Sequence, residues 1–497
     1  AGAEIVVMYH HSYGSTMTVP SLADSISFAH TTDNRRPQNL DEVRQIFAGL
    51  RAEFPCATVV ASTLDDFARA LRKVRGTLPV VTAEIGDTWI HGAASDPRKI
   101  AQYRALSRLR LGWIADDTVD EADERLAAFS RCLLLIPEHT WGLDDKTFLA
   151  DEKDYRQDLS SGLQRTRAIA AMEASWEEQR RYIDEAVDSL GGTPAASQAR
   201  EALLAIEPKR PLLQDMQRVD PASFTLVTPT FRGSFDPESG AISNLIDNRT
   251  ERRLADAAHV LGLFRFQTFS HHDYDRFLAQ YVTGSWDWAL PDFGKPGLEG
   301  ADPEGRWFEP SLVGMWLGED TPRENTAGQT VVIQLRLSEQ GDGVYGCPTD
   351  VFVTVFAPEE AAELHIDVQW FDKQPSRLPH ACWFSFSPVQ GPDATWQMNK
   401  LGSCISPLEV IWNGNRKLHG VLDKVICNDE DHSLAIHTLD APLVAPGDPS
   451  LLNFNNEPPL LQRGMHFNLY NNTWGTNFPS WYGGDARFRF VLKVDVK

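Results

Sequence analysis

The first part of the chain alternates short apolar runs with amphipathic stretches. Residues 40–54 and 64–74 carry apolar side chains at three- and four-residue steps, as amphipathic helices do. The apolar runs around them are short and bounded by polar residues, which is typical of buried strands, and they lie at 5–9, 25–29, 57–61 and 78–85. This strand–helix alternation predicts a parallel sheet, either open or closed into a barrel.

Two local patterns mark where helices should begin. Thr63 followed by Asp66 has the spacing of a capping box, in which each side chain accepts a hydrogen bond from the backbone of the other residue. Asp96 followed by Pro97 has the order of an N-cap residue and a proline in the first helical position. We therefore predict helix starts at both places.

Two further regions follow along the chain. Between 116 and 206 the pattern is charged and helical, which suggests a helical bundle, and 207–222 has the composition of a linker. Alternating runs broken by Gly, Pro, Asn and Asp then continue to the last residue, as in β-sandwiches. The predicted fold is multi-domain α and β, with a partial (β/α) barrel-like domain at 1–115, a helical bundle at 116–206 and a large antiparallel β-sandwich region at 223–497.

The charge and composition of the chain argue against several classes of binding partner. The 497 residues carry a formal net charge of −22, which argues against nucleic acid and anionic membranes as partners. No apolar run approaches the length of a membrane span, and no signal peptide is apparent, so a cytoplasmic location is expected. The six cysteines form no Cys-x-x-Cys pair, which disfavours a disulfide framework or a thiolate zinc site. A homo-oligomer is compatible with these features.

Four stretches together resemble glycoside hydrolase family 38, the zinc-dependent α-mannosidases, and more closely an uncharacterised branch beside it. They are FAHTTDNRRP (28–37), LPVVTAEIGDTWIHGAASDPRK (78–99), FDPESGAISNLIDNRT (235–250) and DKQPSRLPHACWFSF (372–386). The resemblance implies a carbohydrate substrate, zinc as cofactor and retaining cleavage of a neutral glycoside. It also implies that Asp33 stands where the family carries its proposed general acid, although Asp33 followed by Asn34 is equally suited to an Asx turn.

One departure from the family pattern affects the predicted chemistry. The family places a His-x-Asp zinc pair and its nucleophilic Asp before the loop that 28–37 resembles. Here 27 residues precede Phe28, and they offer His10, His11 and Tyr13 but no such pair. We therefore expect the N-terminal part of the catalytic barrel, with the nucleophile and the main zinc ligands, to be missing from this chain.

The stretch EIGDTWIHG (84–92) is the first candidate for substrate binding, because it follows an expected strand and precedes an expected helix. Glu84 and Asp87 could bind sugar hydroxyls while Trp89 stacks on the sugar ring. The alternative is that Trp89 fills the barrel and Asp87 caps a turn. His91 could replace the family's late zinc histidine, although a single His is more often a packed residue.

A second candidate lies near the C-terminus, where amides and indoles alternate. Asn471, Trp474 and Asn477 could bind a sugar through hydrogen bonds and stacking, or could form an Asn-rich turn with a core Trp. In EHTWGLDDK (138–146), His139 and Trp141 could reach a site, but helix packing is the better interpretation. The pair His365 and Asp367 imitates a metal motif, yet an alternating, solvent-facing strand explains it better.

The predicted function is therefore that of a glycoside hydrolase-like protein related to α-mannosidases. It would be an active glycosidase if the full-length chain carries the missing N-terminal segment. The alternative is a non-catalytic carbohydrate-binding or scaffold protein derived from that family.

Overall fold

A computed structural model describes residues 4–9, 15–31, 35–139, 142–284, 287–318, 326–337, 343–476 and 478–497. The chain forms two compact units, Ala1–Ala83 and Glu84–Lys497, called below the N-terminal unit and the C-terminal unit. Two sites expected from the sequence, Asp33 and Asn477, lie outside the described residues, as do His10, His11, Tyr13 and Trp141.

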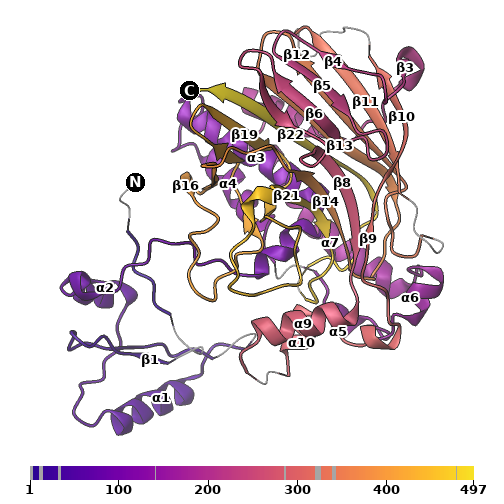
Figure 1. Cartoon of the computed structure of the whole chain (residues 1–497). Helices are drawn as coiled ribbons and strands as arrows, with labels where there is room; N and C mark the ends of the chain where they lie inside the picture. Colours follow the sequence, from indigo (N-terminus) through magenta and orange to yellow (C-terminus); the bar gives the residue numbers. More distant parts are fainter. Residues whose placement is uncertain are drawn as a thin grey trace. The chain divides into compact units, whose positions relative to one another are not determined.

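The N-terminal unit contains two helices that begin at side-chain caps. Helix α1 (Leu40–Glu53) starts at Asn39, and α2 (Leu64–Arg72) starts at Thr63, whose capping box with Asp66 is formed as predicted. A 3₁₀ turn, η1 (Arg75–Thr77), follows α2, and strands β1 (Thr16–Met17) and β2 (Ile26–Ser27) pair antiparallel (Figure 1). These helices therefore form where local sequence signals place them.

The parallel strands predicted for this region are not present among its described residues. The strand pair that does form is antiparallel, and the runs at 5–9, 57–61 and 78–83 make no ladder. Their side chains face solvent, with Ile5 86%, Val60 66% and Val80 80% exposed. An apolar run becomes a buried strand only where neighbouring strands and helices cover it, and the described residues supply no such cover.

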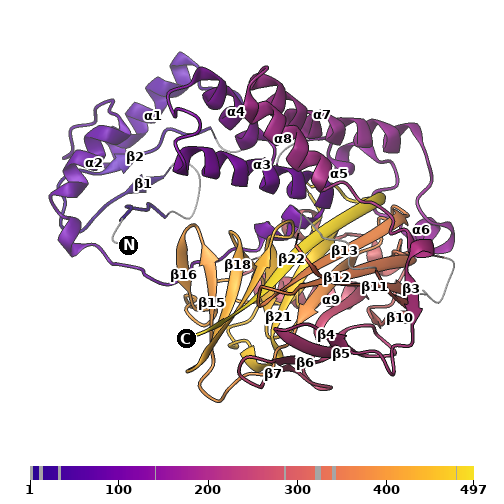
Figure 2. The ribbon, with the colours of Figure 1, turned by 90° about the horizontal axis from the view of Figure 1, so that it is seen from above.

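The C-terminal unit begins with helices. Asp96 caps α3 and Pro97 opens it, as expected, and the helices α3, α4, α7 and α8 lie together beside the strands (Figure 2). The helical elements are η2 (Trp89–Ala94), α3 (Pro97–Ala115), α4 (Glu124–Leu135), α5 (Asp145–Phe148), α6 (Arg156–Ser161), α7 (Arg167–Ser189), α8 (Pro194–Ala205), η3 (Leu213–Asp215), α9 (His271–Tyr281), α10 (Ala289–Phe293), η4 (Leu298–Gly300) and η5 (Leu461–Arg463). Trp113, Phe129 and Ile183 form the centre of the bundle core, which confirms the predicted helical region.

Two large antiparallel sheets make up the rest of the unit, as predicted. Among the described residues one sheet runs β16 (Ser403–Ile405), β15 (Thr395–Lys400), β18 (Lys424–Asn428), β19 (His432–Thr438), β22 (Gly484–Val496), β13 (Glu363–Lys373), β12 (Asp350–Pro358), β11 (Gly328–Arg336), β10 (Ser311–Leu317) and β3 (Gln217–Val219). The other runs β17 (His419–Gly420), β20 (Leu443–Pro446), β21 (Met465–Asn471), β14 (His380–Phe386), β8 (Leu261–Thr268), β6 (Ile242–Asp247), β5 (Phe231–Phe235) and β4 (Leu226–Val227), with β7 (Arg252–Ala255) on β6 and β9 (Trp307–Phe308) on β8.

The inner faces of both sheets share one hydrophobic core. Trp370 and Phe488 come from the first sheet and Phe264 and Phe384 from the second, and each is at most 1% exposed. His365 and Asp367 lie on β13, where Asp367 is 4% exposed and ion-paired with Arg487. Asp367 therefore holds the sheet rather than facing solvent as predicted, because it has a buried cationic partner.

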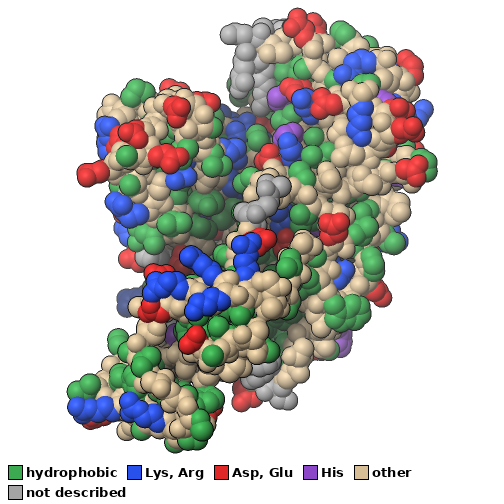
Figure 3. Space-filling view, turned by 90° about the vertical axis from the view of Figure 1, so that its left-hand side faces the viewer, with side chains coloured by type: hydrophobic (Ala, Val, Ile, Leu, Met, Phe, Trp, Pro, Cys, Tyr) green, Lys and Arg blue, Asp and Glu red, His purple; other side chains and the backbone are tan. Residues whose placement is uncertain are grey.

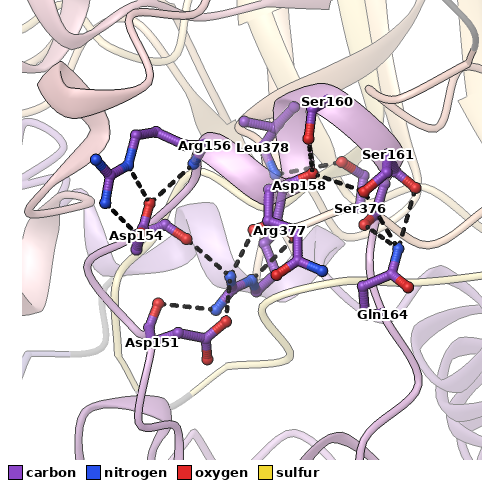
Figure 4. A network of polar contacts seen from close by, with 12 residues as sticks. Asp151, Asp154, Arg156, Asp158, Ser160, Ser161, Gln164, Ser376, Arg377 and Leu378 are labelled. Atoms are coloured by element: carbon purple, nitrogen blue, oxygen red, sulfur yellow. Dashed lines mark hydrogen bonds and ion pairs between the residues drawn. The ribbon is translucent and has the colours of Figure 1, made fainter.

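Buried arginines join the helices to the sheets. Arg104 of α3 donates hydrogen bonds of 2.7–3.1 Å to the carbonyl oxygens of Val421, Leu422, Thr438 and Leu439. Arg377, in the connection between β13 and β14, donates 2.5 Å and 3.2 Å bonds to Asp158 of α6 (Figure 4). Arginine suits this role because its planar fork of N–H groups stays charged and satisfies several acceptors at once.

Candidate functional site

The stretch 84–92 opens the C-terminal unit and is fixed to a loop of the second sheet. Glu84 exchanges backbone hydrogen bonds of 2.8 Å and 2.9 Å with Glu409 and Ile411. Gly86 has φ +52°, and a side chain there would lie 2.6 Å from the carbonyl oxygen of Asn415. Glycine permits both this backbone conformation and the close approach. The strand expected at 78–85 is therefore not formed, and Glu84 makes a single β-bridge with Val410 in the loop between β16 and β17.

The two carboxylates of this stretch contact different elements. Glu84 forms a 2.8 Å ion pair with Lys400. Burial alone would raise the pKa of Glu84, but the hydrogen bond and charge of Lys400 lower that pKa below its ordinary value. Asp87 is exposed and accepts a 3.0 Å hydrogen bond from the hydroxyl of Tyr281, at the end of α9. Glu84 is thus held as an anion within the protein, and Asp87 stays accessible.

Trp89 lies in an aromatic cluster. Its ring centroid is 5.1 Å from that of His139, 5.6 Å from Trp474, 6.0 Å from Phe293 and 6.5 Å from Phe478. Trp89 is partly buried, whereas the His139 side chain is 46% exposed. The structure therefore brings Trp89 and His139 together, and the His139 imidazole is partly open to solvent.

His91 is enclosed by aromatic rings and is unsuited to bind zinc. It is 1% exposed, packs 5.4 Å from Trp474 and 6.2 Å from Phe277, and its Nδ1 has no hydrogen-bond partner. Burial lowers its pKa to about 3, so the ring is neutral. Among the described residues, the group of three metal-ligand side chains is His271, His272 and Asp275 on α9, and His91 is not part of it. A zinc ion at His91 would lack further ligands.

Asn471 uses its amide inside the protein. Its Nδ2 donates to the His91 carbonyl at 2.8 Å and to Asn468 at 2.7 Å, and its Oδ1 accepts two bonds from Thr473. Trp474 is 2% exposed, and its indole N–H has no partner. These two residues therefore support the candidate site from beneath, and Asn477 lies outside the described residues.

Sequence reasoning gave too little weight to His139 and did not find Tyr281. The signal for His139 was present in EHTWG, where polar and aromatic residues meet between helices. No local signal marks Tyr281, because its hydroxyl reaches Asp87 across 194 residues. We define the candidate site as the exposed or partly exposed group Asp87, Trp89, His139 and Tyr281.

A separate cleft of about 560 Å³ lies between α7 and two sandwich loops. Trp176 and Trp481 form part of its wall, with ring centroids 4.7 Å apart, and the Trp481 indole donates to Glu173 at 3.0 Å. Arg180 pairs with Asp96 and Glu177 at the same place. The polar groups of this cleft are largely satisfied by one another, which favours a packing role.

On the face shown in Figure 3, Lys and Arg side chains lie interspersed with acidic and hydrophobic ones. No helix among the described residues combines the length and hydrophobicity needed to span a membrane.

Comparisons with known proteins agree with this fold. The family profile of a domain of unknown function (DUF5054) matches residues 93–365, and no curated protein matches the chain. An α-mannosidase from Enterococcus faecalis V583 matches with a TM-score of 0.51 at 10% identity, over 92% of this chain and 62% of that one. A glycosyl hydrolase family 38 protein from Enterococcus faecalis matches with the same TM-score and identity, over 93% and 63%.

The chain therefore spans less than two thirds of the length of these solved proteins. At 10% identity the likeness is one of fold, and it covers both the helices and the sheets. Since the family profile covers more than half of the chain, the chain belongs to the DUF5054 family, and its fold is similar to that of these two Enterococcus faecalis proteins.

Proposed function

We propose that this protein is glycoside hydrolase-like and acts on a neutral glycoside, in the manner of an α-mannosidase. The observation that carries the proposal is the fold shared with an α-mannosidase over 92% of the chain. The candidate site adds support, because it combines an accessible carboxylate with aromatic rings. Sugars present hydroxyl groups at their edges and an apolar face, so both kinds of side chain would be used.

Each residue of the site would have its own role. Asp87 would accept hydrogen bonds from sugar hydroxyls, and the Tyr281 hydroxyl would orient it. Trp89 would form a wall of the pocket, and the exposed His139 imidazole could donate or accept a proton near the sugar. Asp33, which the family resemblance implies as general acid, stays a prediction because it lies outside the described residues. The residues around His91 do not fit zinc, so no step is assigned to a metal.

Hydrolysis of 4-nitrophenyl glycosides by the protein at its natural length tests the proposal. We expect turnover of the α-mannoside, with the α-anomer of mannose as the first product seen by NMR. Asp87→Asn should lower turnover by about tenfold or more, because it removes hydrogen bonds to a charged group worth about 1.5 kcal/mol or more. Asp448→Asn serves as the control, because that carboxylate is exposed and pairs with Arg463 outside the site. Equal activity of wild type and Asp87→Asn would contradict the role given to Asp87.

One observation favours non-catalytic carbohydrate binding as a second candidate. Retaining hydrolysis needs two carboxyl groups about 5–5.5 Å apart. Glu84 is held in an ion pair with Lys400, so among the described residues of this stretch Asp87 is the accessible carboxylate. Saccharide binding without turnover of any 4-nitrophenyl glycoside would establish this second function. Absence of both binding and turnover would exclude both candidates.

A further inference from the structure

An exposed tryptophan stands on the loop that holds the candidate site. Trp412 lies between β16 and β17 and is 75% exposed. Among the described residues, no aromatic ring or cation packs on its indole. The indole therefore presents a flat apolar surface to solvent, of the kind on which a ligand ring can stack.

The backbone around Trp412 is fixed on both sides. On one side Ile411 donates a 2.9 Å hydrogen bond to the carbonyl oxygen of Glu84. On the other, Asn415 donates from its backbone to Gly86 and from its side chain to the Asp87 carbonyl, both at 3.1 Å. Arg416 donates to the carbonyl oxygens of Val410 and Ile411, which closes the loop from within. The indole is therefore presented on a rigid backbone.

Two amides lie beside the indole. The backbone N–H of Asn413 donates to Asn456 at 2.7 Å, and the Asn456 side chain donates back to the Asn413 oxygen at 2.8 Å. This leaves the amide nitrogen of Asn413 without a hydrogen bond among the described residues. Asn413 has φ +61°, a left-handed conformation that costs energy for residues other than glycine and that the pairing with Asn456 maintains.

We propose that Trp412 and Asn413 form a binding subsite for a neutral oligosaccharide, on which one sugar ring stacks against the indole and donates or accepts hydrogen bonds at the amides. The proposal rests on the proposed carbohydrate function, and it adds a place where a glycan longer than one sugar would be held. The subsite is linked to the candidate site, because Asn415, three residues after Trp412, binds the backbone of Asp87.

The local chemistry favours a sugar over a protein partner. The loop is fixed by backbone groups, the Asn415 amide and the Arg416 guanidinium, and the residues on either side of the indole are Ile411 and Asn413. A protein-docking site would centre on several apolar side chains that exclude water together. A single indole beside the amide nitrogen of Asn413 suits a ligand with one apolar face and a polar edge. The preset backbone also lowers the entropy lost on binding.

Calorimetric titration of the natural-length protein with mannotriose and cellotriose tests the subsite. We expect one of them to bind, and Trp412→Ala to weaken that binding about tenfold, as the loss of a stacked aromatic surface does. Trp412→Phe should keep part of the affinity, and Asn456→Ala should weaken binding by releasing Asn413. Trp307→Ala is the matched control, since this tryptophan is 38% exposed but Arg265 lies 4.8 Å from its ring centroid.

The outcomes separate this inference from the proposed function. If Trp412→Ala loses trisaccharide affinity but keeps turnover of 4-nitrophenyl α-mannoside, which has a single sugar ring, both proposals stand. Lost affinity in a protein without turnover supports the subsite and rejects hydrolysis. Wild-type affinity in Trp412→Ala, or no binding of either trisaccharide, overturns the subsite whatever the turnover. A change in oligomeric state on Trp412→Ala, with saccharide affinity unchanged, also overturns it and points to a protein contact.

Discussion

The burial of His91 should make the stability of the folded protein depend on pH. Its imidazole packs between aromatic rings, with Nδ1 unpaired, and its carbonyl oxygen accepts a hydrogen bond from Asn471. A buried imidazole without a hydrogen-bond partner is stable only in the neutral form. The segment 89–94 can therefore stay docked only where His91 is not protonated.

Stability should fall as the solution is acidified below the ordinary histidine pKa. Burial lowers the pKa of His91 to about 3, so between roughly pH 6.5 and 3 the unfolded chain binds a proton that the folded chain does not. At pH 5 this difference in proton binding at His91 lowers the free energy of unfolding by about 2 kcal/mol. Above pH 7 the effect vanishes, because His91 is then neutral in both states. Urea unfolding at pH 7.5 and at pH 5 measures this change in the free energy of unfolding.

His91→Phe isolates this contribution, because phenylalanine keeps the aromatic packing and cannot titrate. The variant should lose less stability than wild type between pH 7.5 and pH 5. Other buried histidines, including His466, whose pKa burial lowers to about 4, leave a remaining pH dependence in both proteins. Identical losses in variant and wild type would show that His91 is accessible to protons in the folded state.

Among the elements, the short helix α6 depends on a buried ion pair for its position. Arg377, whose side chain is 5% exposed, binds Asp158, whose side chain is 3% exposed, and also Asp151 and the Asp154 carbonyl (Figure 4). Asp154 and Arg156 form a second pair nearby, but both of their side chains are open to solvent. Two Asp–Arg ion pairs therefore involve residues of α6, and one pair is buried while the other is exposed to solvent.

Asp158→Asn should destabilise the protein by about 3 kcal/mol, because it leaves the guanidinium of Arg377 buried without its main counter-charge. Asp154→Asn should leave the unfolding midpoint nearly unchanged, since solvent already screens that pair. Thermal unfolding of the two variants beside wild type gives the comparison. Equal midpoints for all three proteins would mean that α6 is not held by Arg377.

Local signals predicted the elements better than they predicted the site. The caps at Thr63 and Asp96 act within a few residues, so the helices α2 and α3 begin where they are expected. Contacts such as Asn471 with the His91 carbonyl join residues 380 positions apart, which no periodicity contains. The candidate site was therefore found in part, through Asp87 and Trp89, while its remaining members depend on tertiary packing.

At the scale of the whole molecule, the two units differ in how much core each possesses. Among the described residues up to Ala83, the buried side chains are Phe67, Ala70 and Leu71. The C-terminal unit has a continuous core between two sheets and a second core within its helices. Because a small buried core supplies little free energy of folding, the two units should differ in resistance to unfolding.

Limited proteolysis with trypsin should therefore cut the N-terminal unit first. Arg69, Arg72 and Arg75 are open to solvent, at and after the end of α2, where few buried side chains oppose local unfolding. Intact-mass analysis over time should show early loss of residues before 84 and a persistent fragment that retains the helices and both sheets. Early cleavage inside α3 or α7, with 40–83 still attached, would contradict this difference.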